Sequence, residues 1–271
     1  MDNTTLRDIW NSRAEAHAAR KGCKTEDIMS RLYDESWWGY IEPLLADISG
    51  GRVLEAGCGT GRWAERLAPL GFSVALSDIS PNMLVKAREY AEEHGFADNL
   101  RFEELDVCDL HAFEDASFDM VLSTGEPITL CRDPKKAVRE YCRVVRPGGH
   151  VLCDAGNRYR RAFELFGQGR GKEIEEVLAT GECRGHGGLS MHLLGPGELQ
   201  NRFEEEGMEV LTVAGITPMF GFPPDGASKA ALEDEKTLQA MQVIARDYAE
   251  RPEIVAQSSR ILAVARKPLS M

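Results

Sequence analysis

From Gly51 onward, short apolar runs alternate with longer segments whose apolar residues recur at helical spacing. Strands that alternate with helices in this way form βαβ units, which build a parallel sheet with right-handed crossovers. We expect strands at residues 52–57, 73–78, 100–105, 118–123, 150–155, 208–215 and 260–267. We expect helices at residues 60–70, 80–94, 133–145, 158–180, 196–207 and 228–248. The sequence therefore predicts an α/β fold with a mostly parallel, seven-stranded sheet.

Three segments interrupt this alternation and determine the predicted domain organisation. Residues 1–49 read as helical and hold three of the four tryptophans, so this segment must pack against another part of the fold. Residues 157–195 contain a glycine-rich stretch, and residues 216–258 contain the sequence M-F-G-F-P-P-D-G. We interpret residues 1–49 as an N-terminal helical cap. Residues 50–271 would form one domain, with 157–195 and 216–258 inserted as lids over the strand ends.

The charge and cysteine content restrict the partners of the chain. The formal net charge is −12, and no long run of lysine or arginine is present. Surfaces that bind nucleic acid through its phosphates carry clustered positive charge, so we expect no nucleic-acid partner. The seven cysteines include no C-x-x-C pair, which favours free thiols in a reducing compartment. Because no apolar signal core and no long apolar stretch is found, we expect a cytoplasmic protein without a membrane partner, as a monomer or homodimer.

The sequence E-A-G-C-G-T-G, residues 55–61, joins the first predicted strand to a helix. Its three glycines allow a tight turn with positive φ and a close approach of a ligand to the backbone. A dinucleotide-binding G-x-G-x-x-G pattern counted from Gly57 would need glycine where Arg62 stands. A P-loop needs Ser or Thr after Gly-Lys, but the Gly-Lys pair at residues 171–172 is followed by glutamate. Neither phosphate-binding pattern therefore fits.

The turn resembles the first motif, E-x-G-x-G-x-G, of the class I S-adenosylmethionine-dependent methyltransferases. Three further elements match the family in order: Asp78 at the end of the second strand, L-D-V-C-D-L at residues 105–110, and F-D-M-V-L-S-T-G followed by the helix and strand that end in R-P-G-G-H-V-L. The match spans roughly residues 51–155 and is similar to the small-molecule branch of ubiquinone and menaquinone methyltransferases. It implies a Rossmann-like, doubly wound fold and S-adenosylmethionine as cofactor.

The resemblance also implies where the cofactor binds. The Asp78 carboxylate would accept hydrogen bonds from the ribose diol, and Asp106 would meet the adenine amino group. Ser123 and Thr124 lie at the carboxyl end of a strand, where doubly wound sheets bind ligands. Apolar residues on a helix that faces a sheet are often core, and this alternative stays open for Ile79 and Met83. The predicted cofactor-binding residues are Glu55, Gly57, Cys58, Gly59, Gly61, Asp78, Ile79, Met83, Asp106, Val107, Ser123 and Thr124.

The acceptor side departs from the family pattern. Many relatives that modify small metabolites carry a histidine or an aromatic residue soon after the fourth strand, whereas this chain has S-T-G-E-P-I-T-L. Glu126 and His192 are candidate general bases, although a base is needed only if the nucleophile must lose a proton. The candidate substrate-binding residues are Tyr33, Trp38, Glu126, His192 and Phe220. For the aromatic residues among them, ordinary packing is the alternative.

We expect an enzyme that transfers a methyl group to a small-molecule acceptor, with oxygen, nitrogen, sulfur and carbon all open as the acceptor atom. An N-P-P-Y-like tetrad after the fourth strand is absent, which opposes methylation of a nucleic-acid base amine. Cys183, His186 and His192 lack a fourth ligand nearby, so we expect no metal. The alternatives are a non-catalytic S-adenosylmethionine-binding adaptor and a nucleotide-dependent oxidoreductase, and the glycine spacing opposes the oxidoreductase.

Overall fold

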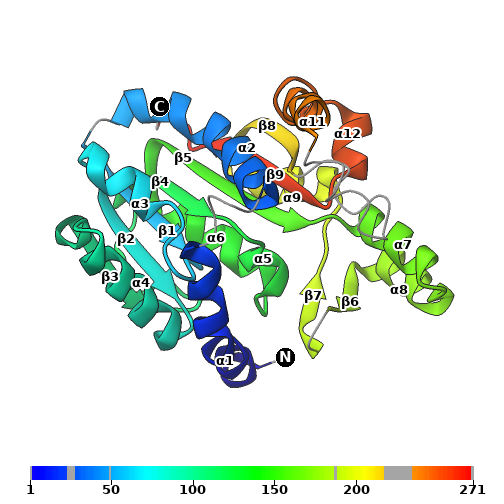
Figure 1. The fold of residues 1–271 in the computed structure, drawn as a ribbon, viewed down its shortest axis with the longest axis horizontal. Coiled ribbons are helices and arrows are strands. Elements are labelled where there is room, and N and C mark those ends of the chain that lie inside the picture. Colours follow the sequence, from blue (N-terminus) through cyan, green and yellow to red (C-terminus); the bar gives the residue numbers. More distant parts are fainter. Residues whose placement is uncertain (1, 23–27, 49, 186–187, 217–233, 270–271) are drawn as a thin grey trace.

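The structure, a computed structural model, describes residues 2–22, 28–48, 50–185, 188–216 and 234–269 (Figure 1). Its centre is a seven-stranded sheet with the strand order β3-β2-β1-β4-β5-β9-β8. The strands of this sheet are β1 Arg52–Ala56, β2 Ser73–Asp78, β3 Leu100–Glu104, β4 Phe118–Ser123, β5 Val145–Gly156, β8 Glu209–Ile216 and β9 Arg260–Arg266. Strand β9 is antiparallel to β5 and β8, and the other neighbouring strands are parallel. The predicted Rossmann-like, doubly wound and mostly parallel sheet is confirmed.

Strand β1 lies at the point where the strand order reverses. Leu54 of β1 is in register with Ala75 of β2 on one side and with Val121 of β4 on the other. The connections that leave β1 and enter β4 therefore run to opposite sides of the sheet. In doubly wound folds this arrangement opens a crevice at the carboxyl ends of the two strands, and ligands bind there.

Helices cover both faces of the sheet (Figure 1). Successive side chains of a strand point to opposite faces, so Val53 packs among α2, α3 and α4, whereas Leu54 packs among α6 and α9. The α-helices are α1 Asn3–Gly22, α2 Ile28–Leu45, α3 Ala64–Leu67, α4 Pro81–Glu93, α5 Pro127–Leu130, α6 Pro134–Val144, α7 Arg158–Gly167, α8 Gly171–Thr180, α9 Pro196–Glu205, α11 Glu235–Asp247 and α12 Pro252–Gln257. Short 3-10 helices are η1 Ala46–Ile48, η2 Ala68–Leu70 and η3 Ala97–Asn99.

Two of these helices begin at side-chain caps. The Ser80 hydroxyl accepts a hydrogen bond from the Met83 amide at 3.2 Å, and Pro81 is the first residue of α4. The Asp133 carboxylate likewise accepts hydrogen bonds from two backbone amides in the first turn of α6. The caps satisfy amides that have no partner inside the helix, and so they fix where each helix leaves the sheet.

Two predicted helices differ from the observed ones. The helix expected over 60–70 begins only at Ala64, after a turn, and continues as η2. The helix expected over 158–180 is divided into α7 and α8 at Gly169, whose φ is +70°. A glycine in this conformation ends the regular α-helix, because positive φ is incompatible with its hydrogen-bonding pattern.

Short elements of the C-terminal half were not predicted. Strands β6 Glu182–Arg184 and β7 Ser190–His192 pair as a separate two-stranded sheet inside the segment interpreted as the first lid. Helix α12 lies in the segment interpreted as the second lid, of which residues 217–233 are outside the described residues. Three-residue strands are too short to show an alternating pattern, so the sequence carried no signal for them.

The two N-terminal helices have different environments. Trp37 and Ile41 of α2 are fully buried against the sheet. Helix α1 instead packs beside α4 (Figure 1), and its polar side chains make most of the side-chain contacts. The division of the chain at residue 49 and the lid role of the insertions stay predictions. Within the described ranges, no helix combines the length and apolar character that a bilayer-spanning segment needs.

Candidate functional site

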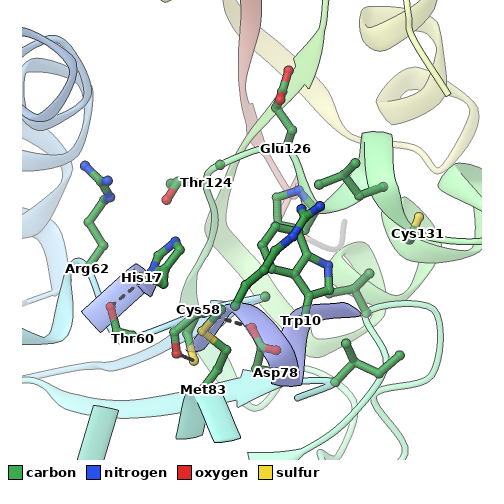
Figure 2. A pocket seen from close by; sticks show the side chains of 18 of the residues that line it. Trp10, His17, Cys58, Thr60, Arg62, Asp78, Met83, Thr124, Glu126 and Cys131 are labelled. Atoms are coloured by element: carbon green, nitrogen blue, oxygen red, sulfur yellow. Dashed lines mark hydrogen bonds between the residues drawn. The ribbon is translucent and has the colours of Figure 1, made fainter. Parts of the chain in front are cut away.

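A cavity of about 830 Å³ opens at the carboxyl ends of β1, β2 and β4, at the predicted crevice (Figure 2). Its wall also includes residues of α1, α2 and α5 and the first residue of β9. Nine of the twelve predicted cofactor-binding residues line it: Gly57, Cys58, Gly59, Asp78, Ile79, Met83, Asp106, Val107 and Thr124.

The glycine turn forms one side of the cavity. Gly57 and Gly59 have φ values of +68° and +54°, which L-residues with a Cβ rarely adopt. A Cβ at Gly57 would lie 2.7 Å from Pro127 Cγ, and a Cβ at Gly59 would lie 3.3 Å from His17 Cε1. The bare backbone of the turn is therefore required both by its conformation and by the elements packed against it.

Glu55 and Gly61 do not line the cavity. The Glu55 carboxylate is buried and accepts hydrogen bonds from the backbone amides of Arg62 at 2.8 Å, Trp63 at 3.2 Å and Ala64 at 3.2 Å. Because these amides donate to Glu55, the expected first turn of the helix does not form, and α3 begins only at Ala64. In this position the Glu55 side chain lies behind the turn and holds its backbone, and the predicted contact with the cofactor stays a prediction. Gly61 packs toward Leu76, whose Cδ1 would lie 3.4 Å from an added Cβ.

Asp78 connects the second strand to the glycine turn. One carboxylate oxygen accepts a hydrogen bond from the Gly59 amide at 2.8 Å, and the other accepts one from the Ser80 amide at 2.9 Å. Burial raises the pKa of Asp78 to about 6, although these backbone hydrogen bonds oppose the shift. A carboxylate has about four lone-pair sites, so two remain that can accept hydrogen bonds from a ligand in the cavity.

Asp106 lies on the same side of the cavity, after β3. One of its oxygens accepts a hydrogen bond from the Cys108 amide at 3.0 Å, and the other accepts one from the Asn3 side chain of α1 at 2.8 Å. Ile79, Met83 and Val107 add apolar surface around it. An apolar slot with a carboxylate at its edge suits a flat heterocycle that carries an amino group.

Several residues predicted for the other side of the site lie elsewhere. Ser123 is buried and shares a hydrogen bond of 2.8 Å with the Tyr141 hydroxyl, outside the wall of the cavity. Trp38 stacks on Trp63 with ring centroids 6.3 Å apart and does not line the cavity either. Tyr33 and Glu126 do line it.

His192 is not part of the cavity. It lies on β7, where its Nδ1 atom is 3.9 Å from a carboxylate oxygen of Glu182. Phe220 is outside the described residues, as is His186. Across the described part of the chain, no group of three or more potential ligands could hold a metal ion.

A row of lining residues on α1 and the lining residues Arg62 and Arg260 were not predicted from the sequence. Leu6, Trp10, Arg13 and His17 recur at intervals of three or four, which places them on one helix face. This mixed aromatic and basic stripe was a readable signal, since a face of that kind does not suit a core. Nothing near Arg260 in the sequence indicates that it lies beside Tyr33, and only the folded sheet brings the two together.

Figure 2 shows Glu126 at the end of the cavity opposite Asp78. Four charged or polar groups lie close together there, namely Tyr33, Glu126, Asp154 and Arg260. The fully buried Asp154 carboxylate accepts a hydrogen bond from the Glu126 amide at 2.7 Å and one from the Tyr33 hydroxyl at 3.1 Å. Arg260 Nε lies 3.6 Å from a carboxylate oxygen of Glu126. Burial raises the pKa of Glu126, and the positive charge of Arg260 opposes that shift.

Comparison with known proteins identifies the domain around the glycine turn. Residues 53–149 match the family described as "Methyltransferase domain". A ubiquinone biosynthesis O-methyltransferase from Xanthomonas oryzae pv. oryzae is 34% identical over 126 residues, which are 46% of this chain and 51% of that relative. The chain thus spans about half the length of this curated relative.

Solved structures agree on the fold. An S-adenosylmethionine-dependent methyltransferase from Mesorhizobium loti aligns with a TM-score of 0.57 and 20% identity, over 85% of this chain and 97% of that one. A geranyl diphosphate C-methyltransferase from Streptomyces coelicolor, solved with S-adenosyl-L-homocysteine, aligns with a TM-score of 0.57 and 15% identity, over 86% and 80% of the two chains. At these identities the likeness concerns the fold. Together with the sequence matches, it shows that residues 53–149 carry a methyltransferase domain and that the chain has the fold of S-adenosylmethionine-dependent methyltransferases.

Proposed function

We propose that this protein transfers the methyl group of S-adenosylmethionine to a small-molecule acceptor. The observation that carries the proposal is the hydrogen bond from the Gly59 amide to Asp78, because it brings a bare glycine backbone and a ribose-binding carboxylate to one wall of the cavity. We also predict that the protein is a monomer or homodimer, that it is cytoplasmic and that it has no nucleic-acid partner.

The residues present fit this cofactor. Gly57 and Gly59 present backbone without side chains to the cavity, where it could receive the amino-acid half of the cofactor. Asp78 would accept hydrogen bonds from the ribose hydroxyls, and Asp106 with Val107 would face adenine. The bound sulfonium supplies an activated methyl group, and the protein aligns the acceptor with it and excludes water.

Among the possible acceptor atoms we favour oxygen, so that the reaction would be an O-methylation. Two curated relatives that match the chain are named as ubiquinone biosynthesis O-methyltransferases. This chain aligns with about half of the first of them, so the acceptor itself is part of the proposal. An acceptor with a hydroxyl group also suits the cavity, because the Glu126 carboxylate in its wall can accept a hydrogen bond from that group.

Calorimetry with S-adenosylhomocysteine and with NADH tests the cofactor. We expect micromolar or tighter binding of the first and none of the second. Asp78→Asn should weaken S-adenosylhomocysteine binding by about 1–3 kcal/mol, since it removes charged hydrogen bonds. The matched control is Asp98→Asn, at an exposed position after α4. Equal affinity for wild type and Asp78→Asn would remove the ribose assignment.

Turnover separates the enzyme from a non-catalytic adaptor. We expect the wild-type protein to form S-adenosylhomocysteine from S-adenosylmethionine when simple catechols are supplied. An adaptor would bind the cofactor with similar affinity and would release no product above the rate without acceptor.

A further inference from the structure

Glu126 has an unusual backbone conformation. Only Glu126 and Ala116 among the non-glycine residues of the described ranges have positive φ, and the value at Glu126 is +69°. Such conformations are costly for residues with a Cβ, and they persist where the surrounding structure enforces them. Here the amide of Glu126 donates a hydrogen bond of 2.7 Å to the buried Asp154 carboxylate. The result is a glutamate whose side chain lines the cavity and is only 16% exposed.

Arg260 faces this carboxylate from the first residue of β9. Its Nε atom lies 3.6 Å from Glu126 Oε2, and one terminal nitrogen lies 3.7 Å from Asp154 Oδ2. Its guanidinium carbon lies 5.2 Å from the centre of the Tyr33 ring, and the Tyr33 hydroxyl donates a hydrogen bond to Asp154. The distances to the two carboxylates exceed the usual range for an N–H···O hydrogen bond. Arg260 and Glu126 therefore form an ion pair whose nitrogen and oxygen atoms are too far apart for a direct hydrogen bond.

This spacing selects among acceptor groups. A carboxylate in the gap would be repelled by Glu126 and Asp154, and an ammonium group would be repelled by Arg260. A neutral hydroxyl can donate a hydrogen bond to the Glu126 carboxylate and accept one from the Arg260 guanidinium. One oxygen atom thereby satisfies both partners.

We propose that Glu126 accepts the proton of the acceptor hydroxyl and that Arg260 stabilises the oxygen as it loses this proton. The proposal rests on the proposed methyl transfer. The oxygen electron pair forms a bond to the methyl carbon, while the carbon–sulfur bond breaks and its electron pair stays on the sulfur. The products are the methyl ether, neutral S-adenosylhomocysteine and a protonated Glu126. Asp154 and Tyr33 are positioning residues, since they hold Glu126 and Arg260.

The electrostatic surroundings fit a proton acceptor. Burial raises the pKa of Glu126, which makes its carboxylate a stronger base. The charged and titratable groups around it are Arg260 from β9, Asp154 from β5, Glu164 from α7 and Tyr33 beside Asp154. Arg260 opposes the upward shift, and the two other carboxylates add to it. The ionised form is the active one, so the rate should rise with pH through the pKa of Glu126.

The test compares Glu126→Gln and Arg260→Gln with the wild type, and Glu253→Gln on the exposed surface of α12 serves as the matched control. Catechol is the acceptor. We expect Glu126→Gln to lower kcat by roughly 10²–10⁴-fold, which is the range typical of general-base removal. The acidic limb of the pH profile should also be lost in this variant. Arg260→Gln should move this limb to higher pH, because the charge that lowers the pKa of Glu126 is gone. Glu253→Gln should match the wild type.

A second measurement is independent of turnover. 4-Nitrocatechol is titrated into protein loaded with S-adenosylhomocysteine, and its absorbance reports the ionised phenol. We expect the wild type to bind the probe as its anion below the pH at which the free probe ionises, and Arg260→Gln to lose this effect, because the positive charge that stabilises the phenolate is gone. S-Adenosylhomocysteine affinity should stay within about threefold of the wild type in both variants, since neither residue belongs to the cofactor side.

Three outcomes overturn this assignment: Glu126→Gln that keeps the wild-type rate, an unmoved pH profile in Arg260→Gln, or wild-type protein that binds S-adenosylhomocysteine but neither methylates nor binds a catechol. A wild-type protein that fails to bind S-adenosylhomocysteine would instead remove the proposed function. The two failures are therefore distinguishable.

Discussion

At the residue scale, Asp78 should make cofactor binding depend on pH. Its pKa is raised from 3.8 to about 6, mainly by burial, so the carboxyl group of the cofactor-free protein becomes protonated below pH 6. Ribose hydroxyls donate to the ionised form. We therefore expect S-adenosylhomocysteine affinity to be constant above pH 7 and to fall by up to about tenfold per pH unit below pH 6. Calorimetry from pH 7.5 to 5 measures this, and an equally steep decline in Asp78→Asn would assign the effect to another group.

A pair of glycine substitutions separates strain from contact with the site. Gly57 and Gly71 both have positive φ, so alanine at either position is strained by about 1 kcal/mol or more. An alanine Cβ at Gly71 meets nothing within 4 Å, whereas at Gly57 it would lie 2.7 Å from Pro127. We expect a larger loss of stability in Gly57→Ala because of this clash, and at least a tenfold loss of S-adenosylhomocysteine affinity only in that variant. Equal affinities in calorimetry would show that the turn tolerates displacement.

The sequence predicted residues at strand ends better than residues from distant elements. Gly57, Asp78 and Glu126 were predicted because each follows a recognisable strand, and the fold places such positions at one edge of the sheet. Glu55 occupies a similar position, but its side chain turns toward three free amides behind the turn. Arg260 was missed because its partners are set by strand order and by packing, which local patterns do not encode.

At the scale of elements, α1 is held over the cofactor side by polar contacts. Asn3 donates to Asp106, and Asn11 accepts hydrogen bonds from the Ser80 hydroxyl at 2.7 Å and the Asn82 amide at 3.3 Å. The buried apolar residues of α1 in the described range are few, chiefly Leu6 and Ala14. An element attached mainly through polar contacts opens at lower free energy than one anchored in the core.

Loosening α1 should therefore accelerate cofactor release. Asn11→Ala removes hydrogen bonds worth about 0.5–1.5 kcal/mol each, so we expect S-adenosylhomocysteine to dissociate several-fold faster with little change in the urea midpoint. Stopped-flow displacement measures the dissociation rate. Asn201→Ala, on the exposed surface of α9, is the matched control. A lower urea midpoint without faster release would place α1 in the stabilising core.

The element predictions failed where tertiary contacts override local pattern. Strands such as β1, β2 and β4 were predicted because parallel strands buried on both faces give apolar runs that stand out from the helices. The helix over 60–70 was too long because Glu55 captures the amides of its first turn. The helix over 158–180 contains Gly169, a readable breaker whose effect depends on how α7 and α8 pack together.

For the whole molecule, the cofactor side and the acceptor side come from different parts of the chain. The residues of the glycine turn, Asp78 and Asp106 all lie within the matched methyltransferase domain, residues 53–149. Tyr33 and Arg260 lie outside it, and Glu126 is the group inside the domain that faces them. A family pattern can therefore predict the cofactor, while the acceptor depends on the segments that flank the domain.

The same division predicts opposite effects for two tryptophans of the N-terminal segment. Trp37 of α2 is fully buried in the core, so Trp37→Ala should lower the free energy of unfolding by about 3–5 kcal/mol, as other large-to-small core changes do. Trp10 of α1 lines the cavity, so Trp10→Ala should weaken S-adenosylhomocysteine binding roughly tenfold through lost apolar contact, and should barely change stability.

Urea unfolding followed by circular dichroism, together with calorimetry, gives both quantities for each variant. We expect residues 1–49 to act as two units, since α2 packs against the sheet and residues of α1 line the cavity. If Trp10→Ala were as destabilising as Trp37→Ala, both helices would belong to one core, and a separate covering role for α1 would be lost.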